Sequence, residues 1–214
     1  MKTIFNRAGA VRPVFSLQAG IGRPVLLFLA MATAVFAGDP APVDLPFYVY
    51  RDFAVPVNHG SPSGWIGDYR DLRISMDHRT NVFAGTSCMS FTYTAQGSRY
   101  SDMAGMQWQN PANNSGDIDG GVNLSRATKL TFWARGEKGG EYISEFSVGG
   151  TLGAYPDTGK TGIQDVLLQP DWTLYEIDLT GCDLSYISCF FGWVASRYHN
   201  RDGFTFYVDE VKFE

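Results

Sequence analysis

The sequence predicts an all-β domain, a sandwich or jelly roll of two antiparallel sheets, preceded by an export signal. Three observations favour this fold class. Short segments that alternate apolar and polar residues recur along most of the chain. Gly, Pro, Asn and Asp separate these segments, as turn residues separate antiparallel strands. No segment beyond the first 37 residues shows a sustained helical period with caps.

The alternating segments are the candidate strands. In residues 89–94, for example, Met89, Phe91 and Tyr93 alternate with serine and threonine. This period of two turns one face of a strand toward a core and the other toward solvent. The candidate strands, in chain order, are 47–53, 89–94, 104–109, 129–135, 142–148, 163–168, 174–179, 190–196 and 204–213.

One long irregular segment, residues 54–84, separates the first two candidate strands. Long loops in compact domains are usually either functional or disordered. Because this segment contains Trp65, Ile66 and Tyr69, we expect an ordered, packed loop.

The N-terminus has the composition of a signal peptide. Basic residues precede a short apolar run, Val25–Phe36, and no acidic residue occurs before Asp39. A small residue, Ala37, follows this run as a signal peptidase site requires. We therefore expect a signal peptide at residues 1–37 and one domain at 38–214, located in the periplasm, at the cell surface or outside the cell. The apolar run is short for a bilayer span, and we expect no membrane span in the mature protein; an uncleaved anchor is the alternative.

The charge of the chain bears on its partners. Seventeen Lys and Arg against 22 Asp and Glu give a formal net charge of −5, and the isoelectric point is about 5.2. A protein that binds nucleic acid usually presents a basic face, so we expect no nucleic-acid partner. An acidic chain can still bind neutral ligands.

The cysteines leave two alternatives open. An exported protein can form disulfides, and Cys182 and Cys189 could pair across a turn. Alternatively, these two residues and Cys88 are all free thiols. The sequence has no CxxC motif and no Cys/His cluster with zinc spacing, so we expect no zinc site.

Five features follow one another in a characteristic order along the chain. They are Asp52 at the end of the first strand, Gly85–Phe91, Asn123–Gly136, Trp172–Leu179 and Tyr207–Val211. The last three are similar to the family motifs Leu-x-Phe-Trp-x-x-Gly, Trp-x-x-Tyr-x-Ile-Asp-Leu and Tyr-x-Asp-Asp-Val. The chain therefore resembles the galactose-binding-like β-jelly roll of exported bacterial proteins, and residues 61–69 and 105–114 also resemble segments of such proteins. The resemblance implies a carbohydrate-binding domain, although one fold hosts many functions.

The resemblance also implies a structural calcium ion. In modules of this type the ion joins the first strand, the start of the Gly-led strand and the last strand. Calcium takes six to eight oxygen ligands from carboxylates, carbonyls and water. The candidate ligands are Asp52, Asp77, the Gly85 carbonyl and Asp209. The alternative is that Asp209 and Glu210 alternate, one facing solvent and the other pairing with a basic side chain.

Carbohydrate binding requires aromatic faces beside a few well-placed polar groups. The chain has 5 Trp, 11 Tyr and 15 Phe, most of which must fill the core. Trp133 shares a strand face with Lys129 and Arg135, whereas Trp108 lies on an apolar face but leads into an amide-rich loop. The candidate ligand contacts are Trp65, Tyr69, Trp108, Asn113, Asn114 and Trp133.

No catalytic motif is evident. The three histidines lie in no Ser/His/Asp or His/Glu pattern, and no nucleophile elbow is present. If the protein is an enzyme, the one candidate catalytic pair is His59 and Asp68, which both lie within residues 54–84. We therefore expect an exported, non-catalytic module that binds a glycan or polysaccharide and has a structural calcium site. The alternatives are an exported lyase or glycoside hydrolase acting on polysaccharide, and a structural or adhesive surface protein.

Overall fold

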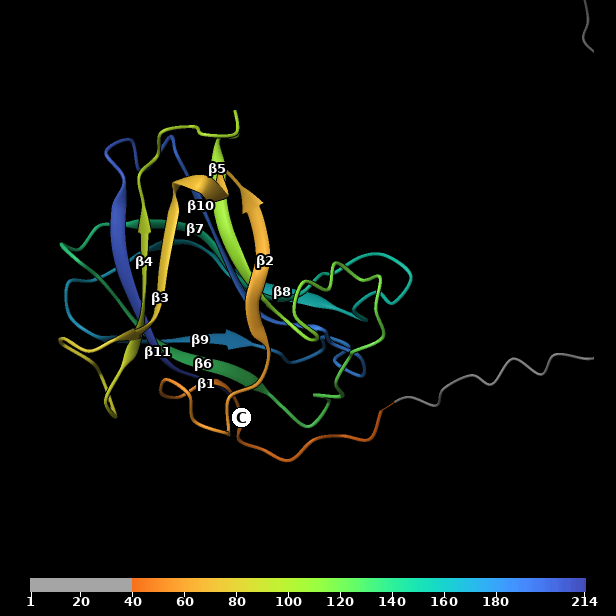
Figure 1. The fold of residues 1–214 in the computed structure, drawn as a ribbon. Coiled ribbons are helices and arrows are strands. Elements are labelled where there is room, and N and C mark those ends of the chain that lie inside the picture. Colours follow the sequence, from red (N-terminus) through yellow and green to blue (C-terminus); the bar gives the residue numbers. More distant parts are fainter. Residues whose placement is uncertain (1–39) are drawn as a thin grey trace, which may run out of the picture. The chain divides into compact units, whose positions relative to one another are not determined.

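Two antiparallel sheets face each other in the computed structural model, which describes residues 40–214 (Figure 1). The predicted signal peptide, residues 1–37, lies outside the described residues. The strands are β1 Phe47–Tyr50, β2 Ser61–Gly67, β3 Leu72–His78, β4 Cys88–Tyr93, β5 Met103–Gln109, β6 Lys129–Gly136, β7 Tyr142–Gly149, β8 Lys160–Leu167, β9 Thr173–Asp178, β10 Cys189–Ser196 and β11 Phe204–Phe213. The helical structure of this part of the chain is one 3₁₀ turn, η1, at Tyr69–Asp71. No helix among these residues is long and apolar enough to cross a membrane.

The strand order confirms the predicted sandwich. One sheet has the order β3-β4-β11-β6-β9, with β1 paired to the end of β11, and is called the six-stranded sheet. The other has the order β2-β5-β10-β7-β8 and is called the five-stranded sheet. Phe47 in β1 is the register partner of Phe213 in β11, so the C-terminus lies beside the first strand (Figure 1).

Aromatic side chains from both sheets fill the space between them. Phe91 of the six-stranded sheet meets Trp108 and Trp193 of the five-stranded sheet edge-on, with ring centroids 5.8 and 5.4 Å apart. All three side chains are at most 1% exposed. Burying a large apolar side chain contributes roughly 1.5–3 kcal/mol, so this layer is a main source of the stability of the sandwich.

All nine predicted strands are present, but the prediction of a loop at residues 54–84 is wrong. The segment contains two strands, β2 and β3. The alternation of Leu72, Ile74 and Met76 signals β3, although charged residues lie between and beyond them. In β2 a bulge between Pro62 and Gly64 breaks the period of two, and this hides the strand in the sequence.

The cysteines form no disulfide in the structure. Cys88 and Cys189 are fully buried, whereas Cys182 is partly exposed. Burial raises the pKa of the Cys88 thiol to about 12, and it raises the pKa of Cys189 as well. Of the two alternatives, the structure therefore has the three free thiols.

Candidate functional site

The outer face of the five-stranded sheet carries a row of small and polar residues that crosses all five strands. Register pairing aligns Gly64 of β2 with Gln107 of β5, and Gln107 with Gly192 of β10. The alignment continues from Gly192 to Ser147 of β7 and then to Gly162 of β8. These five residues are here called the polar row. Gln107, Gly192 and Ser147 face away from the core because their neighbours in sequence fill it, and Gly64 and Gly162 are their register partners on the same face.

Three positions of the polar row are glycine because neighbouring atoms approach them closely. A Cβ atom on Gly64 would lie 2.8 Å from the Gln107 Cβ, and one on Gly192 would lie 3.1 Å from the Gln107 Cγ. A Cβ atom on Gly162 would lie 2.3 Å from the backbone oxygen of Phe146. Backbone therefore forms much of the surface along the row, and Gln107 and Ser147 supply its side-chain polar groups.

These two polar groups are not engaged elsewhere. Within residues 40–214, neither the Gln107 amide nor the Ser147 hydroxyl takes part in a side-chain hydrogen bond. An amide offers two donors and an acceptor, and a hydroxyl offers one donor and an acceptor. The centre of the outer face thus holds unused hydrogen-bonding groups on both sides of Gly192.

Asn113 lies next to one end of the polar row. Its backbone N–H donates to the Ser63 hydroxyl at 2.7 Å, and that hydroxyl lies 3.2 Å from Oε1 of Gln109. Asn113 is exposed at a φ of 61°, and its side-chain amide makes no hydrogen bond within the described residues. The structure therefore places one predicted ligand contact beside Gly64, where its amide is free for a ligand.

Two loops form a wall at the end of the sheet where β5 and β7 finish. The loops 110–121 and 150–159, here called the loop wall, lie side by side beyond β8 (Figure 1). The Tyr155 N–H donates to the Gly116 carbonyl at 2.8 Å, which joins the loops. Tyr155 is 42% exposed, and Leu152 is 78% exposed. The loop wall therefore presents an aromatic ring that the sequence analysis did not select.

Asn114 holds the loop wall together and does not face a ligand. It is fully buried, and its amide donates to the carbonyls of Asn110 and Ile118. Its Oδ1 accepts the N–H groups of Gly116 and Ile118. The prediction of Asn114 as a ligand contact is corrected by this burial, because every polar atom of the side chain is already paired within the loop.

Trp65 and Tyr69 come together at the edge of the five-stranded sheet. Their ring centroids are 6.0 Å apart, and the Arg99 guanidinium lies 4.7 Å from the Tyr69 ring centroid. Trp65 is 47% exposed and follows Gly64 of the polar row directly in the chain. The structure thus brings two predicted contacts together, but Trp65 is the register partner of the core residue Met106 and therefore lies on the side of the sheet opposite to Gly64.

The other two predicted tryptophans lie elsewhere. Trp108 is 1% exposed and packs on Phe91 and Phe191, so burial in the core corrects its prediction as a ligand contact. Trp133 lies on the outer face of the six-stranded sheet, where the Phe83 ring stacks on it at 3.9 Å. Phe83 belongs to residues 79–87, here called the covering loop, which occupies the Trp133 face that a sugar would need.

The predicted calcium ligands fasten the covering loop. Asp209 is fully buried, and its carboxylate accepts the N–H groups of Phe83 and Ala84 at 3.2 and 3.1 Å. Asp52 accepts from the Thr86 N–H at 3.0 Å and from the Ser87 hydroxyl. The bond from Ser87 lowers the pKa of Asp52, whereas burial raises the pKa of Asp209 to about 7 despite its N–H donors.

This arrangement does not form a cage for calcium. Both carboxylates accept hydrogen bonds from the protein, and Asp77 pairs with the Arg79 guanidinium at 2.9 Å. In the described part of the chain, no group of three or more His, Cys, Asp or Glu side chains is placed to hold a metal ion. Calcium binding therefore stays a prediction.

His59 and Asp68 do not form a catalytic pair. The His59 ring stacks on Phe47 at 4.0 Å, and its Nδ1 lies 2.9 Å from the Tyr48 carbonyl oxygen. Asp68 lies beyond the other end of β2, roughly 20 Å away for a seven-residue strand, and accepts the N–H groups of Arg99 and Ser101. His59 and Asp68 thus each contact the backbone of a different segment.

The comparisons with known proteins concern the fold. Neither a protein-family model nor a curated protein matches the chain. A solved structure of a family 30 carbohydrate-binding module is similar to it at 19% identity and a TM-score of 0.50, over 79% of this chain and 87% of that one. A family 30 module of a cellulosomal cellulase of Clostridium thermocellum is similar at 18% identity and a TM-score of 0.50, over 80% of this chain and 98% of that one. Residues 40–214 therefore have the β-sandwich fold of these carbohydrate-binding modules.

Proposed function

We propose that this domain is a non-catalytic module that binds a glycan or polysaccharide on the outer face of its five-stranded sheet. The observation that carries the proposal is the polar row, where Gln107 and Ser147 flank Gly192 with their hydrogen-bonding groups unused. The likeness to family 30 carbohydrate-binding modules supports the class of ligand. The predicted signal peptide agrees with a function outside the cell or in the periplasm.

The proposed binding combines two kinds of contact. Sugar hydroxyls bond to the Gln107 amide, the Ser147 hydroxyl and the Asn113 amide, which have no side-chain partner in the described residues. The exposed Tyr155 ring of the loop wall packs on the apolar face of a sugar ring. Glycine positions between the polar groups leave room for the ligand to approach the backbone.

Replacing Gln107 or Ser147 with alanine tests the proposal. Each substitution removes about one net hydrogen bond, so we expect each to weaken binding about fivefold. The measurement is retardation of the protein in native gels that contain β-glucan, mannan or xylan, followed by calorimetric titration with the polysaccharide that retards it.

Ser90→Ala provides a matched control. Ser90 lies on the outer face of the six-stranded sheet, where it is the register partner of Ser75 and Tyr207. We expect this variant to bind as the parent does. If Ser90→Ala weakens binding as much as Ser147→Ala, or if neither Gln107→Ala nor Ser147→Ala weakens it, the polar row is not the binding site.

We further propose that a structural calcium ion binds between the covering loop and the neighbouring strands. A cavity of about 320 Å³ borders Asp52, Gly85 and Glu210, which gives an ion access to carboxylate oxygens. Because Asp52 and Asp209 already accept protein hydrogen bonds, the ion would have to replace some of these donors. Its role would be to hold the loop, with no part in contacting the glycan.

A further inference from the structure

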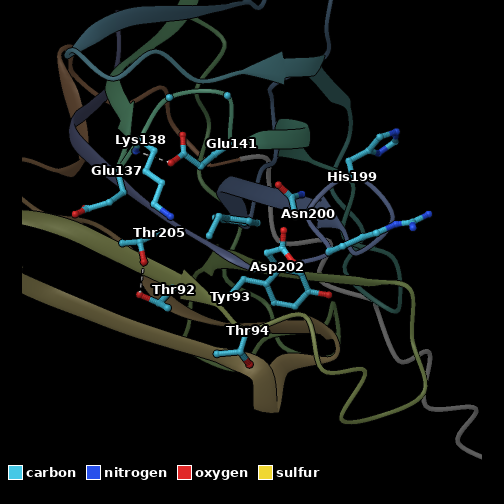
Figure 2. Close-up of a pocket in the computed structure, with 15 residues that line it drawn as sticks. Thr92, Tyr93, Thr94, Glu137, Lys138, Glu141, His199, Asn200, Asp202 and Thr205 are labelled. Carbon is cyan, nitrogen blue, oxygen red and sulfur yellow. Dashed lines mark hydrogen bonds between the residues drawn. The ribbon is translucent and has the colours of Figure 1, made fainter.

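A second cavity lies where three connections of the sandwich meet. Its volume is about 530 Å³, within the range of ordinary small-molecule sites. The end of β4, the β6–β7 connection 137–141 and the β10–β11 connection 199–203 line it, together with the start of β11 (Figure 2). We call it the end cavity. It shares no residue with the polar row.

Lys138 is an unused cation in the end cavity. Within residues 40–214 its ammonium group makes no ion pair and no hydrogen bond. Figure 2 shows its side chain extending toward Thr205. The neighbouring Glu137 is bonded to the Tyr207 hydroxyl and lies 3.9 Å from the Arg135 guanidinium. Lys138 therefore remains free to donate to a ligand.

A pair of threonine hydroxyls lies below Lys138. The Oγ1 atoms of Thr92 and Thr205 are 3.0 Å apart and face each other across β4 and β11 (Figure 2). Two hydroxyls that share one hydrogen bond keep one hydrogen free to donate. The pair therefore offers both a donor and acceptors to the cavity.

Glu141 holds the backbone of Lys138 in place. It is 8% exposed, and its Oε1 accepts the backbone N–H of Lys138 at 2.8 Å. Its Oε2 is buried and has no hydrogen-bond partner in the structure. This oxygen faces Gly136 and is closed off from the cavity, so the carboxylate serves to hold the β6–β7 connection.

We propose that the end cavity binds one or two sugar rings of a glycan through their hydroxyl groups. Lys138 donates to the sugar, whereas the threonine pair both donates and accepts. Phe204 and Tyr93 supply the apolar part of the lining. The class of ligand rests on the proposed function, but the site does not, because its residues are separate from the polar row. The protein would then hold a glycan at two places.

An NMR titration of the full chain with cellobiose and with mannobiose tests the end cavity. We expect the amide signals of Gly139, Gly140 and Gly203 to shift and to saturate with one of these disaccharides. Lys138→Met removes the donor and retains much of the side-chain length, so we expect it to raise the dissociation constant about fivefold. Thr205→Val is a second variant, with the same expected direction.

Gln107→Ala separates this proposal from the proposed function. If the two sites are distinct, this variant keeps the shifts at Gly139, Gly140 and Gly203. Shifts confined to Gly105, Gly162 and Gly192 would overturn the end cavity and leave the polar row as the glycan site. Unchanged affinity in both Lys138→Met and Thr205→Val, or the absence of shifts with either sugar, also overturns the end cavity.

Discussion

Single aspartates in this domain act mainly as acceptors for backbone N–H groups. Asp52, Asp68, Asp71 and Asp209 each accept at least one such bond from a loop that is distant in sequence. Hydrogen bonds to a charged acceptor are stronger than neutral ones. Part of the acidic composition of the chain therefore serves to order loops. The net charge alone does not show this role.

The buried Asp209 should make the stability of the domain depend on pH. Its pKa in the folded protein is about 7, against an ordinary value of 3.8. The folded state therefore holds this proton more tightly than the unfolded state. The bound proton therefore adds to the free energy of unfolding. This contribution is complete below about pH 4 and is lost as the pH rises through 7, and it amounts to a few kcal/mol at most.

Comparing the parent with Asp209→Asn measures this contribution. Asparagine has nearly the same shape but does not titrate. We expect the parent, relative to the variant, to lose free energy of unfolding between pH 4 and pH 7 in denaturant titrations. Parallel pH profiles for the two proteins would contradict the assignment to Asp209.

At the scale of elements, the turn η1 anchors the β4–β5 connection. Asp71 accepts the N–H groups of Gly97 and Ser98 at 2.8 and 3.3 Å. Asp68, just before the turn, accepts those of Arg99 and Ser101 at 2.7 and 3.0 Å. Two buried carboxylates thus hold four backbone donors of one loop in place.

Hydrogen exchange should distinguish the two anchors. We expect Asp71→Ala to speed exchange at Gly97 and Ser98, and Asp68→Ala to speed it at Arg99 and Ser101, because each substitution removes only its own acceptor. Each should also lower stability by about 1–3 kcal/mol, since each substitution removes two hydrogen bonds to a carboxylate. A uniform increase across the loop in both variants would show that it opens as one unit, contrary to separate anchoring.

At the scale of the whole molecule, the covering loop connects the beginning and end of the chain. Asp52 follows β1, and Asp209 lies in β11, and both bond to this loop. If calcium binds here, it ties the same segments together. We expect the melting temperature to fall when a chelator is added to the parent, but not in Asp209→Ala. Equal melting of the parent with calcium and with chelator would rule out a stabilising ion.

The sequence predicted nine strands because their apolar residues alternate cleanly, but it did not predict the site. The polar row depends on cross-strand register, which places Gln107 beside Gly192 although 85 positions separate them. Similarly, Trp133 is correctly placed on an outer face, yet Phe83, 50 positions away, covers it. Local periodicity predicts which way a side chain points, whereas long-range pairing decides which other residues it meets.

The direction of the polar row also limits the shape of what can bind. The row runs across the strands, and five strands at the usual spacing extend over roughly 19 Å from first to last. An unbranched sugar polymer lying along this line would touch the protein through several consecutive units. Further units would project past the sheet on either side, so the domain could attach at an interior stretch of a long polymer without needing its terminus.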